Sequence, residues 1–251
     1  MKKADKSLDK FSGSCDEAES SLEKVKRSMA SINKVVSGLD KAMTTVFKGL
    51  AGVATALGGL SKATEGVRES QAKLSSAFKS AGASAKTAQD TYNGLYRVLG
   101  EDDRSVEAAN HLAKITTNEQ ELAEWTKICE GVFATFGDSL PIEGLTEAVN
   151  ETIKTGKVVG VLADALNWAG VSEDVFNAKL ANTSSLEERE AMIRGTLNGL
   201  YMNAANVYEA ENQAVLRQNE AHAQLNQTLA QLNSVISPAI TSILNLANSI
   251  L

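Results

Sequence analysis

Residues 8–60 decide the fold, and they read LDKFSGSCDEAESSLEKVKRSMASINKVVSGLDKAMTTVFKGLAGVATALGGL. Apolar residues recur in this stretch at alternating spacings of three and four. With Leu8 as the first a position of a heptad, every a and d position is apolar, in a chain that is 43% hydrophobic. A repeat of 3.5 residues keeps one stripe against a partner when helices supercoil, so the pattern predicts a coiled coil about 78 Å long.

We call these a and d positions the first seam. The a positions are Leu8, Cys15, Leu22, Met29, Val36, Met43, Leu50 and Leu57, and the d positions are Phe11, Ala18, Val25, Ile32, Leu39, Val46, Val53 and Leu60. An apolar stripe of this kind needs a partner helix. The partner is either another copy of the chain, which is the interpretation we favour, or a second part of the same chain folded back as a long hairpin.

The residues beside the first seam change character along the coil. They are polar in its first half, whereas from Val35 onward they are small or apolar, so the stripe widens and more helices must pack around it. We therefore expect a homo-oligomer of three or more copies. The outward f positions form a basic line, which is either a solvated face or a contact with an acidic surrounding wall. Its members are Arg27, Lys34, Lys41, Lys48 and Lys62.

Composition narrows the class of protein. The net charge of −6 over 251 residues argues against a specific nucleic-acid binder, which carries a clustered basic excess. The two cysteines are expected as reduced thiols rather than as a disulfide. No signal peptide is apparent at the start. The uncharged stretch Gly49–Ser61 is about 13 residues long, whereas a membrane span needs about 20, so we expect bundle packing rather than membrane insertion.

Residues 81–184 contain closely spaced helix signals and no sustained alternation of period two, which predicts a compact multi-helix module and an all-α fold. Glycines mark helix ends, and two pairs resemble capping boxes, Asn118 with Glu121 and Ser185 with Glu188. The helices expected in the module are 87–99 ending at Gly100, 104–115 capped by Asp102 and Asp103, 118–137, 139–156, 158–169 and 172–180.

After Ser185 the helical pattern continues to the end of the chain. A second seam of three and four spacings is made by Leu225, Leu229, Leu232, Ile236, Ala239, Ile243, Leu246 and Ile250. Pro238 should kink or interrupt this helix. The expected layout is an N-terminal coiled-coil rod (1–80), the helical module (81–184) and a long C-terminal helix (185–251). Because the sequence stops in mid-pattern at Leu251, we expect the helix to continue beyond it.

Candidates for catalysis or metal binding are few. His111 and His222 have no histidine or cysteine at ligand spacing, so we read them as exposed or capping residues rather than as zinc ligands. Cys129 lies among apolar residues, which favours a structural thiol over a nucleophile. We therefore predict no metal site.

Three glutamates, Glu143, Glu147 and Glu151, share one helix face. A surface role is favoured over a catalytic pair, although like charges at this spacing need a nearby cation. Lys154 and Lys157 lie toward the same helix end. The glycines form no nucleotide-binding motif. We therefore predict neither an enzyme nor a cofactor.

Several strings in the middle of the chain resemble the core of phage tail tape measure proteins of the siphovirus or prophage kind. They are Gly131-Val132-Phe133-Ala134-Thr135-Phe136-Gly137, residues 140–152 (LPIEGLTEAVNET), residues 162–170 (LADALNWAG) and residues 172–177 (SEDVFN). The resemblance extends over roughly residues 87–232, and the preceding coil suits the N-terminal part of such a protein.

The resemblance implies a structural virion protein that sets tail length. Several copies would lie together in the lumen of the tail tube, and tail tube protein would polymerise around them with tail assembly chaperones in the host cytoplasm. The copies would leave the virion ahead of the genome at infection. The chain lacks the long hydrophobic segment and lytic domain of some relatives and is too short to span a tail, which fits an N-terminal fragment.

The alternative hypothesis is a membrane-active helical toxin or pore-forming protein that inserts residues 49–60. Leakage of liposomes discriminates between the two, because a tail ruler fragment without a membrane-spanning segment should leave vesicles intact.

Overall fold

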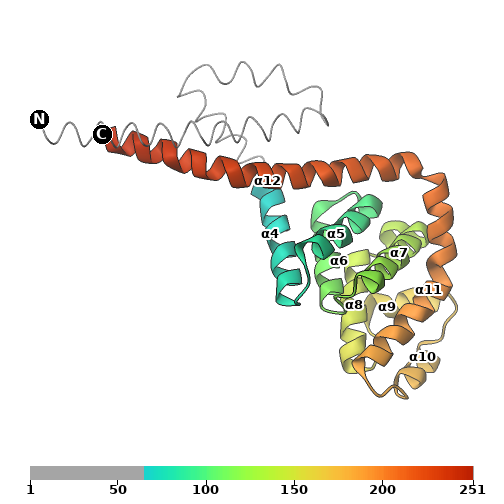
Figure 1. Cartoon of the computed structure of the whole chain (residues 1–251). Coiled ribbons are helices and arrows are strands. Elements are labelled where there is room, and N and C mark those ends of the chain that lie inside the picture. Colours follow the sequence, from blue (N-terminus) through green and yellow to red (C-terminus); the bar gives the residue numbers. More distant parts are fainter. Residues whose placement is uncertain (1–64, 251) are drawn as a thin grey trace, which may run out of the picture. The chain divides into compact units, whose positions relative to one another are not determined.

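The computed structural model describes the backbone of residues 65–250 and the side chains of residues 65–232. Within this range the chain is helical and contains no strand, as the sequence predicts (Figure 1). Residues 1–64 of the predicted N-terminal coiled-coil rod (1–80), which include the whole first seam, lie outside the described residues. The helices are α4 (Glu65–Ser80), α5 (Ala85–Leu99), α6 (Asp102–Ala113), α7 (Glu119–Phe136), the short 3-10 helix η1 (Gly137–Ser139), α8 (Ile142–Thr155), α9 (Gly160–Trp168), α10 (Glu173–Leu180), α11 (Leu186–Glu211) and α12 (Gln213–Ile250).

The chain divides into two compact units. One comprises Ser70–Gln224, and the other comprises Met1–Glu69 together with Leu225–Leu251. In the first unit α7 contacts α5, α8 and α11, while α6 packs on α5 and α8, and α9 packs on α8. The largest fully buried side chains of this unit include Trp125 on α7, Tyr92 on α5, Phe78 on α4 and Phe176 on α10. The core therefore draws on helices from the whole length of this unit.

Four of the predicted helix ends are confirmed at the level of individual residues. Gly100 and Gly156 adopt left-handed backbone conformations with φ of 69° and 70°, which glycine adopts at low cost. The side chain of Asn118 accepts hydrogen bonds from the backbone N–H groups of Gln120 and Glu121. The Ser185 hydroxyl accepts a hydrogen bond from the backbone N–H of Glu188 at 3.1 Å. These caps satisfy donors that an isolated helix end leaves free.

The start of α6 differs from the prediction. The N-cap is Glu101, and the helix begins at Asp102 rather than at Arg104, so both aspartates lie in its first turn. Carboxylates in that turn interact favourably with the positive end of the helix dipole. Asp102 also accepts a hydrogen bond from the Tyr92 hydroxyl at 2.6 Å, which ties α6 to α5.

The predicted C-terminal helix is divided into two helices. α11 ends at Glu211 and α12 begins at Gln213, while the side chain of Asn212 donates to the Tyr208 carbonyl at 3.0 Å. α11 buries a stripe at four-residue spacing against the core of the first unit, so that unit extends past the predicted boundary at residue 184. The buried apolar members of the stripe are Ile193, Leu197, Tyr201 and Ala205.

Pro238 does not interrupt α12. The helix runs unbroken from Gln213 to Ile250, although a proline deprives the carbonyl four residues earlier of its donor. At 1.5 Å per residue, these 38 residues correspond to a length of about 57 Å.

Candidate functional site

The two predicted seams remain predictions. The first seam lies outside the described residues. Of the second seam, Leu225 and Leu229 are half-buried and Leu232 is buried. Ile236, Ala239, Ile243, Leu246 and Ile250 lie on α12, and their side chains lie outside the described range.

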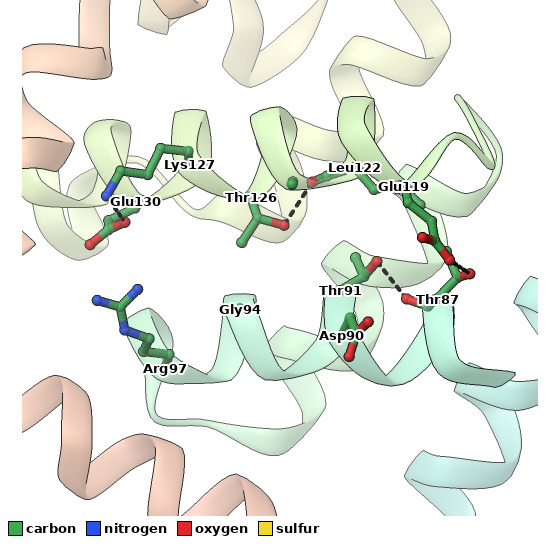
Figure 2. Close-up of a pocket in the computed structure, with 11 residues that line it drawn as sticks. Thr87, Asp90, Thr91, Gly94, Arg97, Glu119, Leu122, Thr126, Lys127 and Glu130 are labelled. Carbon is green, nitrogen blue, oxygen red and sulfur yellow. Dashed lines mark hydrogen bonds and ion pairs between the residues drawn. The ribbon is translucent and has the colours of Figure 1, made fainter. Parts of the chain in front are cut away.

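A groove of about 310 Å³ runs between α5 and α7 (Figure 2). The two helices approach closely at Gly94, where an added Cβ would lie 2.5 Å from Cγ2 of Thr126. The groove has charged residues at both ends and an apolar middle. Its lining consists of Thr87, Asp90, Thr91, Gly94, Arg97, Glu119, Leu122, Ala123, Thr126, Lys127 and Glu130.

One end of the groove carries four charges from three helices. Arg97 on α5 and Lys127 on α7 each form an ion pair with Glu209 on α11, and Lys127 also pairs with Glu130 at 2.9 Å. Hydrogen bonds from Lys127 and Arg97 lower the pKa of Glu209. Burial acts to lower the pKa of Lys127, but its hydrogen bonds to Glu209 and Glu130 outweigh that effect and raise it.

Glu130 is the most buried member of this cluster. Its side chain is 3% exposed, and Lys127 binds only its Oε2 atom. The Oε1 atom is buried without a hydrogen-bond partner among the described residues. A buried carboxylate oxygen without a donor is rare in folded proteins, because its lost hydration is not replaced.

The other end of the groove is acidic and more exposed. The Thr87 hydroxyl donates to Glu119 at 3.0 Å, and Asp90 pairs with Lys86, four residues earlier on α5. Thr91 donates its hydroxyl proton to the Thr87 carbonyl at 2.8 Å. Two carboxylates therefore stand near one ammonium at this end.

A second polar cluster joins α7 to α11 inside the core. The indole N–H of Trp125 donates to Glu190 at 2.8 Å, and Arg194 donates to the same oxygen at 2.7 Å. Arg194 also pairs with Glu124 and, at 3.5 Å, with Glu121. Glu190 is thus a buried carboxylate whose charge is compensated.

The cation that pairs with Glu143, on the glutamate face of α8, is not one of the two lysines that the sequence suggested. Nε of Arg104 on α6 lies 3.2 and 3.1 Å from the two oxygens of Glu143, and the same guanidinium bonds Asp138 at 2.9 Å. Sequence spacing pointed to Lys154 and Lys157, but the compensating charge at Glu143 comes from a helix 39 residues away in sequence. This pairing supports a structural role for Glu143.

The remaining candidates are buried or isolated. Cys129 is buried, and burial raises the pKa of its thiol to about 12, as expected for a structural thiol. His111 is half-buried in the last turn of α6, and its Nδ1 atom has no hydrogen-bond partner among the described residues. His222 is exposed. No group of three or more potential metal ligands occurs among the residues that the structure describes.

No helix between residues 65 and 250 combines the length and the apolar character that crossing a membrane requires.

Comparison of the chain with protein-family models, with curated proteins and with solved structures found no significant match. The site must therefore be judged on its own residues.

The sequence did not single out the charged end of the groove. Arg97 and Glu209 look like ordinary surface residues, because their partners lie on other helices. Lys127 has one partner on its own helix, Glu130, and one on α11, Glu209. Glu130 offered one local signal, since it is the only charged residue between Ile128 and Phe136. A lone carboxylate on the apolar part of a helix predicts a buried, paired charge.

Proposed function

We propose that the chain is the N-terminal part of a phage tail tape measure protein, a structural virion protein that sets tail length. The observation that carries the proposal is the resemblance of four strings to that family. In the fold these strings occupy consecutive elements, from the end of α7 through α8 and α9 to α10. They therefore belong to one compact unit rather than to scattered surface loops.

The physical basis of a ruler is the fixed rise of an α-helix, which converts residue number into length. α12 follows α11 in the chain, and its 38 residues correspond to a helix about 57 Å long. In the proposed mechanism, copies associate through the first and second seams, and tail tube protein polymerises around the resulting rope with assembly chaperones. The compact unit of each copy then occupies a fixed position along the tail. At infection the rope leaves ahead of the genome.

The test changes the length of the rod without changing its seam. Duplication of residues 225–245 inserts three heptads into α12 and should lengthen the tail by about 31 Å. Tail lengths are measured by electron microscopy in the phage that carries the gene. Unchanged tails would contradict the ruler function.

A matched control separates length from mass. A flexible insertion with the same number of residues is placed at Gly170, an exposed turn between α9 and α10. It adds the same mass but no helical rise, so tails should keep their original length. Equal lengthening by both insertions would mean that helical rise does not set the length.

A further inference from the structure

The chain changes direction between α11 and the first turns of α12 at a single residue, Asn212 (Figure 1). The backbone angles of Asn212 are φ −110° and ψ 22°, whereas an α-helix needs about −63° and −42°. Helical hydrogen bonds still reach this residue from both sides. The Asn212 N–H donates to the Tyr208 carbonyl at 2.9 Å, and the Leu216 N–H donates to the Asn212 carbonyl at 3.0 Å. The departure from a continuous helix is therefore centred on one residue.

The bend leaves three pairs of backbone groups apart. In a continuous helix the N–H groups of residues 213–215 would donate to the carbonyls of residues 209–211. No backbone hydrogen bond joins these two sets in the described part of the chain. Residues 213–215 are exposed, so water can take the place of the missing carbonyls. A straight helix would replace that solvation with three internal hydrogen bonds.

The sequence does not dictate the bend. Residues 200–237 contain neither glycine nor proline, the two residues that usually break a helix. The neighbours of Asn212 are Ala210, Glu211, Gln213 and Ala214, all of which have good helix propensity. Because the local sequence is compatible with one uninterrupted helix, contacts with the rest of the unit must hold the bent form.

Those contacts are few. Leu216 is 2% exposed and Ala223 is fully buried, and the side chain of Asn219 donates to the Arg97 carbonyl in the last turn of α5 at 3.0 Å. A hollow of about 290 Å³ remains beside the bend, between α5, α11 and the start of α12. It is lined by Arg97, Glu209, Gln213, Leu216, Arg217 and Glu220. The first turns of α12 are therefore docked on one narrow face, with incomplete packing next to it.

We propose that Asn212 is a hinge, and that α11 and α12 exchange between this bent form and one continuous helix. In the straight form the 26 residues of α11, Asn212 and the 38 residues of α12 make a helix about 98 Å long. Docking of Leu216 and Asn219 favours the bent form, and a partner that covers the same face of α12 favours the straight form. The hinge does not rest on the proposed role in tail length, because its contacts all lie within the unit Ser70–Gln224.

A distance measurement between two spin labels tests the hinge in the full chain. Asn203 on α11 and Ala221 on α12 are both exposed, and they are replaced by cysteine in a Cys15→Ser background. Their separation of 18 residues is five helical turns, so a straight helix places them on one side at about 27 Å. Dilution with unlabelled chain removes distances between copies. The expected result is a shorter distance for the bent form together with a component near 27 Å.

Substitutions should shift the balance between the two forms. Asn212→Ala and Asn212→Gly both remove the side chain, but alanine favours the helix, so the ratio of straight to bent should be about fivefold higher with alanine. Leu216→Gln weakens docking and should also enlarge the 27 Å component, whereas Val215→Gln, at an exposed neighbour, should leave it unchanged.

Two results would overturn the hinge. One is a single shorter distance in the unsubstituted chain and in every variant, since the bend would then be fixed. The other is an equal ratio of the two forms in Asn212→Ala and Asn212→Gly. If Leu216→Gln does not fold, the two variants of Asn212 decide the matter.

Discussion

Gly131 on α7 lies directly against the backbone of Tyr201 on α11. A Cβ built on Gly131 would stand 2.2 Å from the Tyr201 carbonyl oxygen and 2.8 Å from its carbonyl carbon. The obstacle is main chain, which cannot rotate away as a side chain can. This contact fixes the distance between the two helices that carry Trp125, Glu190 and the Glu209 end of the groove.

Gly131→Ala should therefore destabilise the compact unit, although alanine favours the helix by about 1 kcal/mol. Overpacking against rigid backbone costs about 1–3 kcal/mol, so after the gain in helix propensity we expect a net loss of up to about 2 kcal/mol in the free energy of unfolding, measured by urea denaturation. Gly195→Ala on α11 is the control, because open space surrounds its Cβ, and it should gain up to about 1 kcal/mol. A stabilised Gly131→Ala variant would refute the close contact.

Removing the buried carboxylate of Glu190 should cost far more than removing an exposed one. Glu190→Ala leaves the Trp125 N–H without an acceptor and Arg194 without its most buried partner, which predicts a loss of about 3 kcal/mol. Glu124 is 45% exposed and pairs with the same arginine. Glu124→Ala should therefore cost less than about 1 kcal/mol. Similar losses in the two variants would argue against the buried network.

His111 should make the compact unit less stable as the pH falls. Burial and the charge of Lys114 lower its pKa below the ordinary value of 6.5, and the charges of Glu147 and Glu107 only partly oppose this. The unfolded chain therefore takes up a proton first, and stability is lost as the pH drops below about 6.5. One proton contributes at most about 1.4 kcal/mol per pH unit, and less for a half-buried ring.

The measurement is urea unfolding at intervals from pH 7.5 to about pH 5, above the ordinary range of carboxylate titration. His111→Gln should flatten the decline in stability that the unsubstituted chain displays. His222→Gln changes an exposed histidine and should retain that decline. Parallel curves for all three proteins would exclude His111 as the responsible group.

Cys129 should be unreactive while the compact unit is folded. With a pKa of about 12, roughly one thiol in ten thousand is ionised at pH 8, and the side chain is also buried. In a Cys15→Ser background, thiol labelling should be slow in buffer and fast in denaturant, and the slow rate should report opening of α7. Prompt labelling in buffer would place Cys129 at an accessible surface.

Local signals in the sequence predicted the helices of the described region well. Gly100, Gly156, Asn118 and Ser185 mark helix ends because they satisfy or relax backbone groups within a few residues of themselves. The same signals said little about which helix packs on which. For example, the sequence predicted that residues of α11 begin a long rod, whereas the buried stripe of α11 packs against α7.

The groove could not be predicted because its elements meet only through the fold. Arg97 and Glu209 are 112 residues apart in sequence, and no periodicity relates them. The partner of Glu143 was missed for the same reason, since Arg104 lies on another helix. The lone carboxylate of Glu130 on an apolar stretch is a local signal of a buried charge, although the sequence analysis did not use it.

The central claim is that several copies of this chain associate along their apolar seams. Sedimentation equilibrium of the full chain, over a wide range of concentration, tests it most directly. The monomer has a mass of 26.6 kDa, and the account predicts an assembly of at least three times that mass. A double substitution in the first seam, Val36→Asp with Met43→Asp, should return it to the monomer. A mass of 26.6 kDa at every concentration of the unsubstituted chain would contradict the account.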